Sequence, residues 1–188
     1  AGKAPIKSKM PSTYGYAESV PALCETRWGQ DAPYNNLCPT ATDGTRTLTG
    51  CAATSTAQVL FYHRAPEHGI GSHTIYYPAN NMAGMKISVD FEKDNYDWNA
   101  MLETYDAGYS TEEGDAVALI MRDLGVAFDM EYGSDAEGGS GALHENVAIG
   151  LQRYYGIDDA KYIVRKDYSD DEWMRIIYEQ INDKQPLV

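Results

Sequence analysis

TGCAATSTAQVLFYH, residues 49–63, is the most informative stretch of this chain. Four apolar side chains recur at the i, i+4, i+7 and i+8 spacing of one helical face. They are Ala53, Ala57, Leu60 and Phe61. Small residues flank that face and let neighbouring backbone approach closely. We therefore predict a central helix over residues 51–63, packed on several sides, with Cys51 in its first turn.

Cys51 carries the strongest indication of chemistry. A thiol at the start of a helix faces unpaired amide groups and the positive end of the helix dipole, which favour the nucleophilic thiolate. Gly50 immediately before it leaves the approach side uncovered. The alternative interpretation is a buried cysteine that acts as a small apolar residue, the commonest role of a lone cysteine.

Catalysis by a thiol also needs a hydrogen-bond donor for the oxyanion of the tetrahedral intermediate. Gln30 is the candidate, because a loop amide upstream of a nucleophile helix can reach across a cleft. The alternative is an ordinary surface glutamine.

None of the four histidines is a clear candidate for the general base. His63 would lie roughly 18 Å from Cys51 along a continuous helix, which excludes direct proton transfer. His68 and His73 follow the far end of that helix, so we expect them to be remote, and His144 is the one local candidate, with a surface role as the alternative. His63, His68 and His73 are spaced five residues apart, which does not align them on one helical face, and a proline lies between the first two. We therefore predict neither a metal site nor a cofactor.

The remaining pattern predicts further helices and one hairpin. The helices are expected at 19–28, from Asp97 to Leu102, from a Ser110–Glu113 capping box to Gly125, at 140–156, and after a Ser169–Glu172 capping box. β-rich stretches at 73–77 and 86–91 flank a turn region and indicate an irregular hairpin. Residues 186–188 resemble the start of a strand, and residues 1–16 an extended arm or processing remnant.

Composition excludes several partners. The 188 residues carry a net charge of −13, which would repel nucleic acid and anionic lipid. No apolar run approaches the roughly 18 to 20 residues of a membrane helix. Three cysteines allow one disulfide, and pairing Cys24 with Cys38 leaves Cys51 free; the alternative is two inert thiols in a reduced protein.

Residues 49–63 closely resemble the nucleophile helix of the streptopain family of papain-like cysteine proteases, in its interpain-like branch. Four other segments extend the resemblance over about residues 20–188. They are Gly-Gln-Asp-Ala-Pro-Tyr-Asn at 29–35, Asn-Tyr-Asp-Trp-Asn at 95–99, Met-Glu-Tyr-Gly at 130–133 and Gln-Pro-Leu-Val at 185–188.

The resemblance implies an α+β, papain-like fold of two lobes, with a helical lobe that carries Cys51 and an antiparallel sheet lobe that is incomplete in this chain. It implies that Cys51 is the nucleophile and Gln30 the oxyanion donor. The loop of Gly138, Gly139, Ser140 and Gly141 would line the substrate cleft near a pocket for an apolar side chain. It further implies a secreted bacterial endopeptidase made with an inhibitory propeptide.

The chain departs from the family pattern in one respect that matters for chemistry. The family's catalytic histidine lies after the position that corresponds to Val188, so residues 17–188 form a catalytic domain without its His-bearing part. We expect that histidine on a C-terminal segment or on a second chain. An inactive papain-like binding or adhesion module, and an enzyme that transfers acyl groups to amines, are the alternatives to a peptidase.

Overall fold

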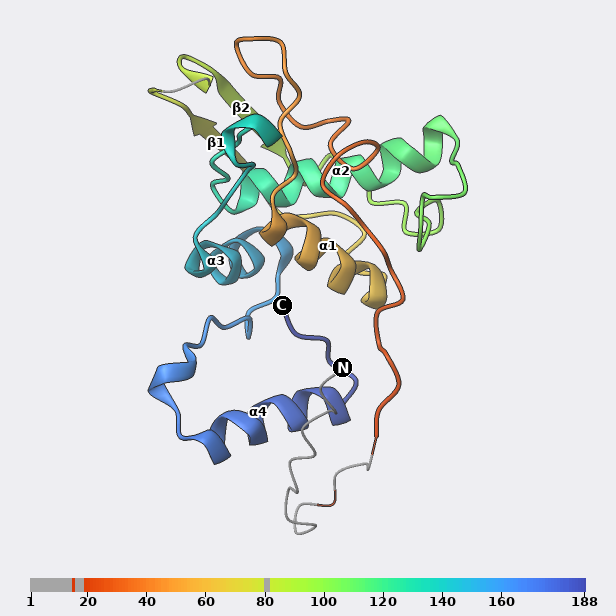
Figure 1. Cartoon of the computed structure of the whole chain (residues 1–188), viewed down its shortest axis with the longest axis vertical. Helices are drawn as coiled ribbons and strands as arrows, with labels where there is room; N and C mark the ends of the chain where they lie inside the picture. Colours follow the sequence, from red (N-terminus) through yellow and green to blue (C-terminus); the bar gives the residue numbers. More distant parts are fainter. Residues whose placement is uncertain (1–14, 16–18, 80–81) are drawn as a thin grey trace, which may run out of the picture. The chain divides into compact units, whose positions relative to one another are not determined.

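The computed structural model describes residues 15, 19–79 and 82–188 (Figure 1). The arm predicted for residues 1–16 therefore lies, apart from Gly15, outside the described residues.

The chain divides into two compact units. The larger unit is Cys24–Val164 together with Val188, and the smaller one combines Arg165–Leu187 with the described residues before Cys24. Every residue that we predicted to act in catalysis or substrate binding belongs to the larger unit.

Helix α1 spans Cys51–His63, which confirms the predicted central helix. Its buried residues include alanines and threonines, which are small enough to admit close neighbours on more than one side. Arg64 ends the helix in the left-handed conformation, and its amide donates to the carbonyls of Leu60 and Phe61. Pro66 then prevents the helix from continuing.

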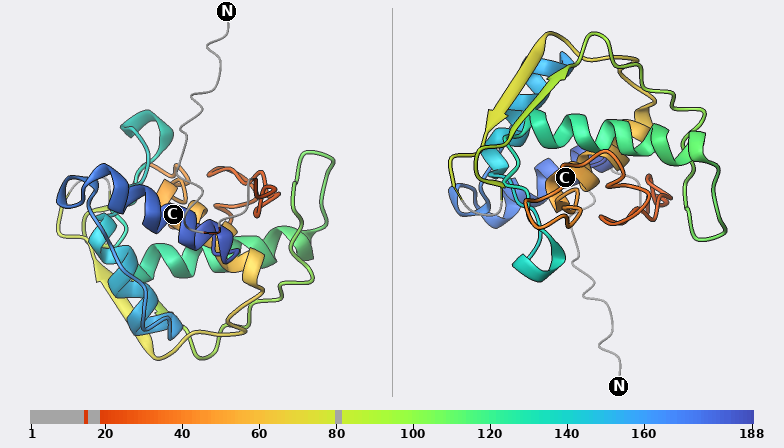
Figure 2. Two further views of the ribbon diagram at one scale, coloured as in Figure 1. Left: turned by 90° about the horizontal axis from the view of Figure 1, so that it is seen from below. Right: turned by 90° about the horizontal axis from the view of Figure 1, so that it is seen from above.

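Helix α2, Thr111–Ala127, is the central element of the larger unit. It begins at the predicted capping box, in which the Ser110 hydroxyl accepts from the Glu113 amide (3.2 Å) and the Glu113 carboxylate accepts from the Ser110 amide (2.6 Å). It packs against α1, α3 and both strands of the hairpin. Figures 1 and 2 show α2 between the hairpin on one side and α1 on the other.

Helix α3 spans His144–Tyr155, so it begins four residues later than predicted. The cause is a non-local interaction: Gly141 and Glu131 form an isolated antiparallel bridge, which holds the preceding residues in an extended conformation. Gly156 closes the helix with φ 67°, a conformation that favours glycine. α3 lies close to the end of α2, because a Cβ atom on Gly150 would lie 2.6 Å from the Ala127 carbonyl oxygen.

This close approach makes Gly150→Ala a strongly destabilising change. The clash involves backbone of the end of α2, which cannot move aside as a flexible side chain would, so α3 must shift. We expect the free energy of unfolding to fall by about 3 kcal/mol, at the upper end of overpacking costs. Urea unfolding measures it, with Glu145→Ala on the exposed first turn of α3 as the control. Equal effects of the two changes would contradict the close approach.

The predicted hairpin is present. Strand β1, Ser72–Tyr76, pairs antiparallel with β2, Lys86–Asp90, and Ile75 lies opposite Ile87. With the helices, this sheet confirms the α+β class.

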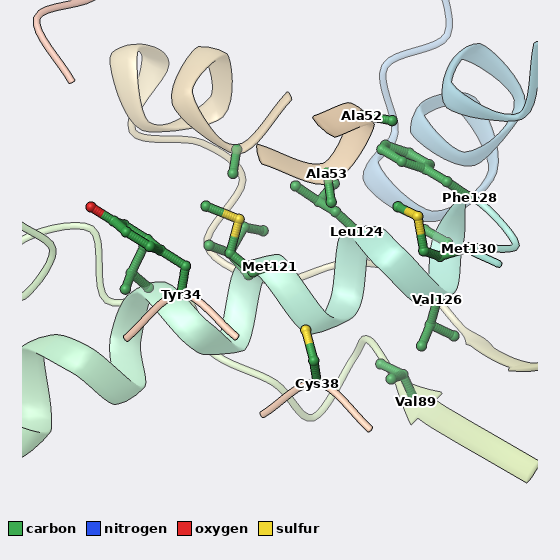
Figure 3. Packing of buried hydrophobic residues seen from close by; sticks show 14 of the residues in the cluster. Tyr34, Cys38, Ala52, Ala53, Val89, Met121, Leu124, Val126, Phe128 and Met130 are labelled. Carbon is green, nitrogen blue, oxygen red and sulfur yellow. The ribbon is translucent and has the colours of Figure 1, made fainter. Parts of the chain in front are cut away.

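A single apolar core holds the larger unit together (Figure 3). Ala53 of α1 faces Leu124 of α2, and Met130 and Phe128 extend the core beyond the end of α2 (Figure 3). The fully buried large side chains of α2 are Val117, Ile120, Met121, Leu124 and Val126. This core fixes the start of α1, and with it Cys51, to a rigid support.

Two helices that we predicted are absent. Residues 19–28 are not helical; the Arg27 amide donates to the Glu103 carbonyl (2.9 Å) and the Trp28 indole to the Leu102 carbonyl (2.8 Å). These long-range bonds outweigh a weak local helix pattern. The segment after Asp97 makes one turn only, in which the Asp97 carboxylate accepts from two amides that follow it.

The smaller unit contains helix α4, Asp170–Asn182, and the short 3-10 helix η4, Arg165–Asp167. The predicted capping box at Ser169 is confirmed. Residues 185–188 do not form the strand that we predicted at 186–188. None of the helices in the described part of the chain is long and apolar enough to cross a bilayer.

Candidate active site

Cys51 is the first residue of α1, and its side chain is exposed and free. The N-cap residue, Gly50, provides no side chain, and the first turn of α1 has no acidic residue. The amides of this turn therefore keep their hydrogen-bonding capacity for another group. The alternative of a buried structural cysteine is wrong for Cys51.

The turn before Cys51 has little freedom. Gly50 has φ 86° and ψ 140°, and a Cβ atom there would lie 2.5 Å from the Met130 sulfur. The buried hydroxyls of Thr49 and Thr54 are 2.8 Å apart, and the Thr54 hydroxyl also donates to the Gly50 carbonyl (3.1 Å). These contacts hold the sulfur-bearing residue in one place.

An open groove of about 640 Å³ lies beside Cys51. Its lining residues come from three segments of the chain. They are Trp28, Gly29, Gln30 and Asp31, then Leu48, Cys51, Thr54, Ser55 and Gln58, and finally Asp135. The structure thus brings together Cys51 and Gln30, which are 21 residues apart in the sequence numbering.

Hydrogen bonds from two successive amides place the outer segments of the groove. The Leu48 amide donates to the Gly133 carbonyl (3.0 Å) and the Thr49 amide to the Gln30 carbonyl (3.1 Å). These two bonds attach the segment that contains Gln30 and the segment that contains Gly133 to the turn before Cys51.

The predicted substrate loop, residues 138–141, lies next to this turn. The Ser140 hydroxyl accepts from the Gly133 amide (3.0 Å) and donates to the Leu48 carbonyl (2.7 Å). The Ser140 carbonyl would lie 3.3 Å from a Cβ atom on Gly50. Asp135, in the short 3-10 helix η3, Asp135–Glu137, comes shortly before this loop and lines the groove; the four loop residues lie outside the groove lining, so their contact with substrate stays a prediction.

Residues 28–188 match the sequence profile of the Peptidase C10 family. The match covers most of the chain. The chain belongs to this family.

Solved structures and curated relatives agree with this membership. The active wild-type interpain A cysteine protease of Prevotella intermedia is 46% identical with a TM-score of 0.87, over 94% of this chain and 71% of that one. A prointerpain A fragment from the same organism is 45% identical with a TM-score of 0.86, over 93% of this chain and 55% of that one. The predicted papain-like fold is therefore confirmed. Streptopain of Streptococcus pyogenes is 29% identical over 95% of this chain, which spans half the length of that relative.

None of the four histidines of this Peptidase C10 chain lines the groove. His144 stacks on Tyr162, with ring centroids 5.9 Å apart, and His73 pairs with Asp129 at 2.7 Å. His63 is the last residue of α1, at the opposite end from Cys51. Within the described residues, no cluster of three His, Cys, Asp or Glu side chains could hold a metal ion.

The disulfide between Cys24 and Cys38 is absent, and both thiols are free. Cys38 is buried beneath α2 (Figure 3), and burial raises the pKa of its thiol to about 12. Cys24 is half-buried, which also raises the pKa of its thiol. Of the three cysteines, only Cys51 has an exposed side chain.

Asp31 and Asp135 are charged groove residues that the sequence did not indicate. Asp135 precedes the predicted Gly-rich loop by three positions, and no local pattern shows that it lines the same groove as Cys51. The signal that could have found it is the combination of an acidic side chain with a loop already expected to line the substrate cleft.

Proposed function

We propose that Cys51 is the nucleophile, Gln30 the oxyanion donor and residues 138–141 the substrate loop of a secreted bacterial cysteine endopeptidase. The observation that carries the proposal is the exposed, free Cys51 as the first residue of α1, in a groove shared with Gln30. A binding module that lacked the chemistry would have no need for an exposed thiol in this position.

The reaction begins when the Cys51 thiolate attacks a peptide carbonyl and forms a tetrahedral intermediate. The Gln30 side-chain amide and the Cys51 backbone amide donate to its oxyanion. The intermediate collapses to an acyl-enzyme as the amine leaves with a proton, and water then hydrolyses the thioester. The loop from Gly138 to Gly141, which the Ser140 hydroxyl attaches to the Leu48 carbonyl, contacts the substrate next to the groove.

The proton that moves in each step requires a base close to the thiol. Because no described histidine lines the groove, we propose that the histidine comes from polypeptide outside these 188 residues, either a C-terminal segment or a second chain. An inhibitory propeptide is also part of the proposal, and the existence of a prointerpain A fragment among the solved relatives supports it.

Labelling with an epoxysuccinyl peptide tests the proposal. We expect one covalent adduct per molecule of full-length protein, on Cys51, together with complete loss of peptide hydrolysis. Intact mass spectrometry counts the adduct and peptide mapping locates it. Cys51→Ser should abolish both the adduct and hydrolysis, whereas Cys24→Ser, which removes a half-buried thiol, should change neither. A Cys51 that stays unmodified in the full-length protein would contradict the proposed function.

A further inference from the structure

Two carboxylates from different segments of the chain line the groove beside Cys51. Asp31 comes directly after Gln30, and Asp135 lies two residues after Gly133. Both residues are exposed, and neither has an ion-pair partner within the described part of the chain.

No basic side chain lines the groove to offset these carboxylates. The nearest basic residues in the sequence have other partners or positions. Arg46 donates to the Cys38 carbonyl (2.6 Å), and Arg27 lines a different hollow, together with Glu103. The remaining lining residues, other than the Cys51 thiol, carry no charge at any ordinary pH.

Asp135 is not needed to cap its own helix. The capping box of η3 is made by Ser134 and Glu137, and the Glu137 carboxylate accepts from the Ser134 amide (3.0 Å). The side chain of Asp135 is therefore available to a ligand in the groove.

The net charge of −13 cannot by itself produce selectivity at this groove. At 0.1 M salt, exposed charges more than about 10 Å apart are largely screened from each other. A substrate side chain that lies in the groove responds mainly to the carboxylates beside it.

We propose that Asp31 and Asp135 make the groove selective for peptides with lysine or arginine beside the scissile bond. This inference rests on the proposed function, because selectivity is expressed only if Cys51 cleaves peptides. A peptide bound in the groove shares it with both carboxylates, so a basic side chain close to the scissile bond can pair with one of them. Leu48 in the lining is partly exposed and offers apolar surface to the aliphatic stem of such a side chain.

Matched peptides that differ only in arginine or citrulline, which is nearly isosteric and uncharged, test the proposal. The full-length protein should show a kcat/KM about five-fold higher for the arginine peptide at low salt, in the range of exposed ion pairs. The preference should shrink as salt is added. Asp135→Asn and Asp31→Asn should each lower it about two-fold, and the double variant should abolish it, while citrulline-peptide hydrolysis persists.

Asp115→Asn is the matched control, because Asp115 is exposed on α2 and does not line the groove. It removes the same unit of charge and should leave the preference unchanged. Equal kcat/KM values for the two peptides, or an equal loss in Asp115→Asn, would overturn the selectivity and leave the proposed function standing. If neither peptide is cleaved and Cys51 cannot be labelled, the proposed function fails and the selectivity fails with it.

Discussion

Replacing Gln30 with alanine should lower kcat for peptide hydrolysis about 100- to 1000-fold, the loss typical for removal of one oxyanion donor. The reason is that Gln30 would donate to an oxyanion that exists only after the Cys51 thiolate has attacked. An interaction made only with the transition state appears in kcat, whereas KM should change little. Steady-state kinetics on a fluorogenic peptide measures both constants.

Gln58→Ala is the control for this effect. Gln58 lines the same groove, but its side chain is already engaged, because its carbonyl accepts from the Thr26 hydroxyl (2.8 Å). We expect less than a ten-fold change in kcat from Gln58→Ala, within the range of an indirect effect. Gln30→Ala should also keep its epoxysuccinyl adduct on Cys51, which would show that the nucleophile is intact. A comparable loss in the two glutamine variants would contradict an oxyanion role for Gln30.

The elements predicted correctly are those whose signals are local. The capping boxes at Ser110 and Ser169 define the starts of α2 and α4, because a side chain three residues away satisfies the first amides of each helix. Cys51–His63 was predictable for a similar reason, since one apolar face and a proline after its end fix the helix. The hairpin follows from β-rich stretches on either side of a turn.

The errors arise where distant segments meet. Residues 19–28 have a weak helical pattern, and bonds to Leu102 and Glu103 hold part of this segment in a different conformation. The start of α3 is displaced by the bridge between Glu131 and Gly141. The first interaction joins residues more than 70 positions apart, beyond any local window, and the second is a single bridge that a helical pattern does not reveal.

The candidate site shows the same division. That Cys51 and Gln30 lie in one groove could be predicted, Cys51 from its place at a helix start and Gln30 with the help of a family resemblance, while their catalytic roles stay predictions. Asp135 could not, because the groove is assembled from three segments, and only tertiary hydrogen bonds such as Leu48 to Gly133 bring the third one into place. The pairing of Cys24 with Cys38 was left open by spacing, and the three-dimensional structure has both thiols free.

Gly50→Ala should reduce kcat/KM about 100-fold, because a displacement of about 1 Å near a reacting group can have that effect. Two causes act together. A φ of 86° is unfavourable for a residue with a side chain and costs about 1 to 3 kcal/mol. In addition, the new Cβ atom would lie 2.5 Å from the Met130 sulfur, so the turn that carries Cys51 has to move.

Two companion variants separate these causes. Gly44 has φ 88° and open space around its Cβ position, so Gly44→Ala measures the cost of a positive φ without a steric clash. Met130→Ala removes the clash but leaves a cavity, and it therefore lowers stability by itself. In the Met130→Ala background, Gly50→Ala should lower the free energy of unfolding by about 1 kcal/mol less than in the wild type, because the effects of substitutions at residues in contact are not additive. Urea unfolding and kcat/KM of the wild type, the two single variants and the double variant give this coupling. If Gly50→Ala costs the same in both backgrounds, Met130 does not hold the nucleophile turn, and the backbone conformation of Gly50 alone keeps Cys51 in place.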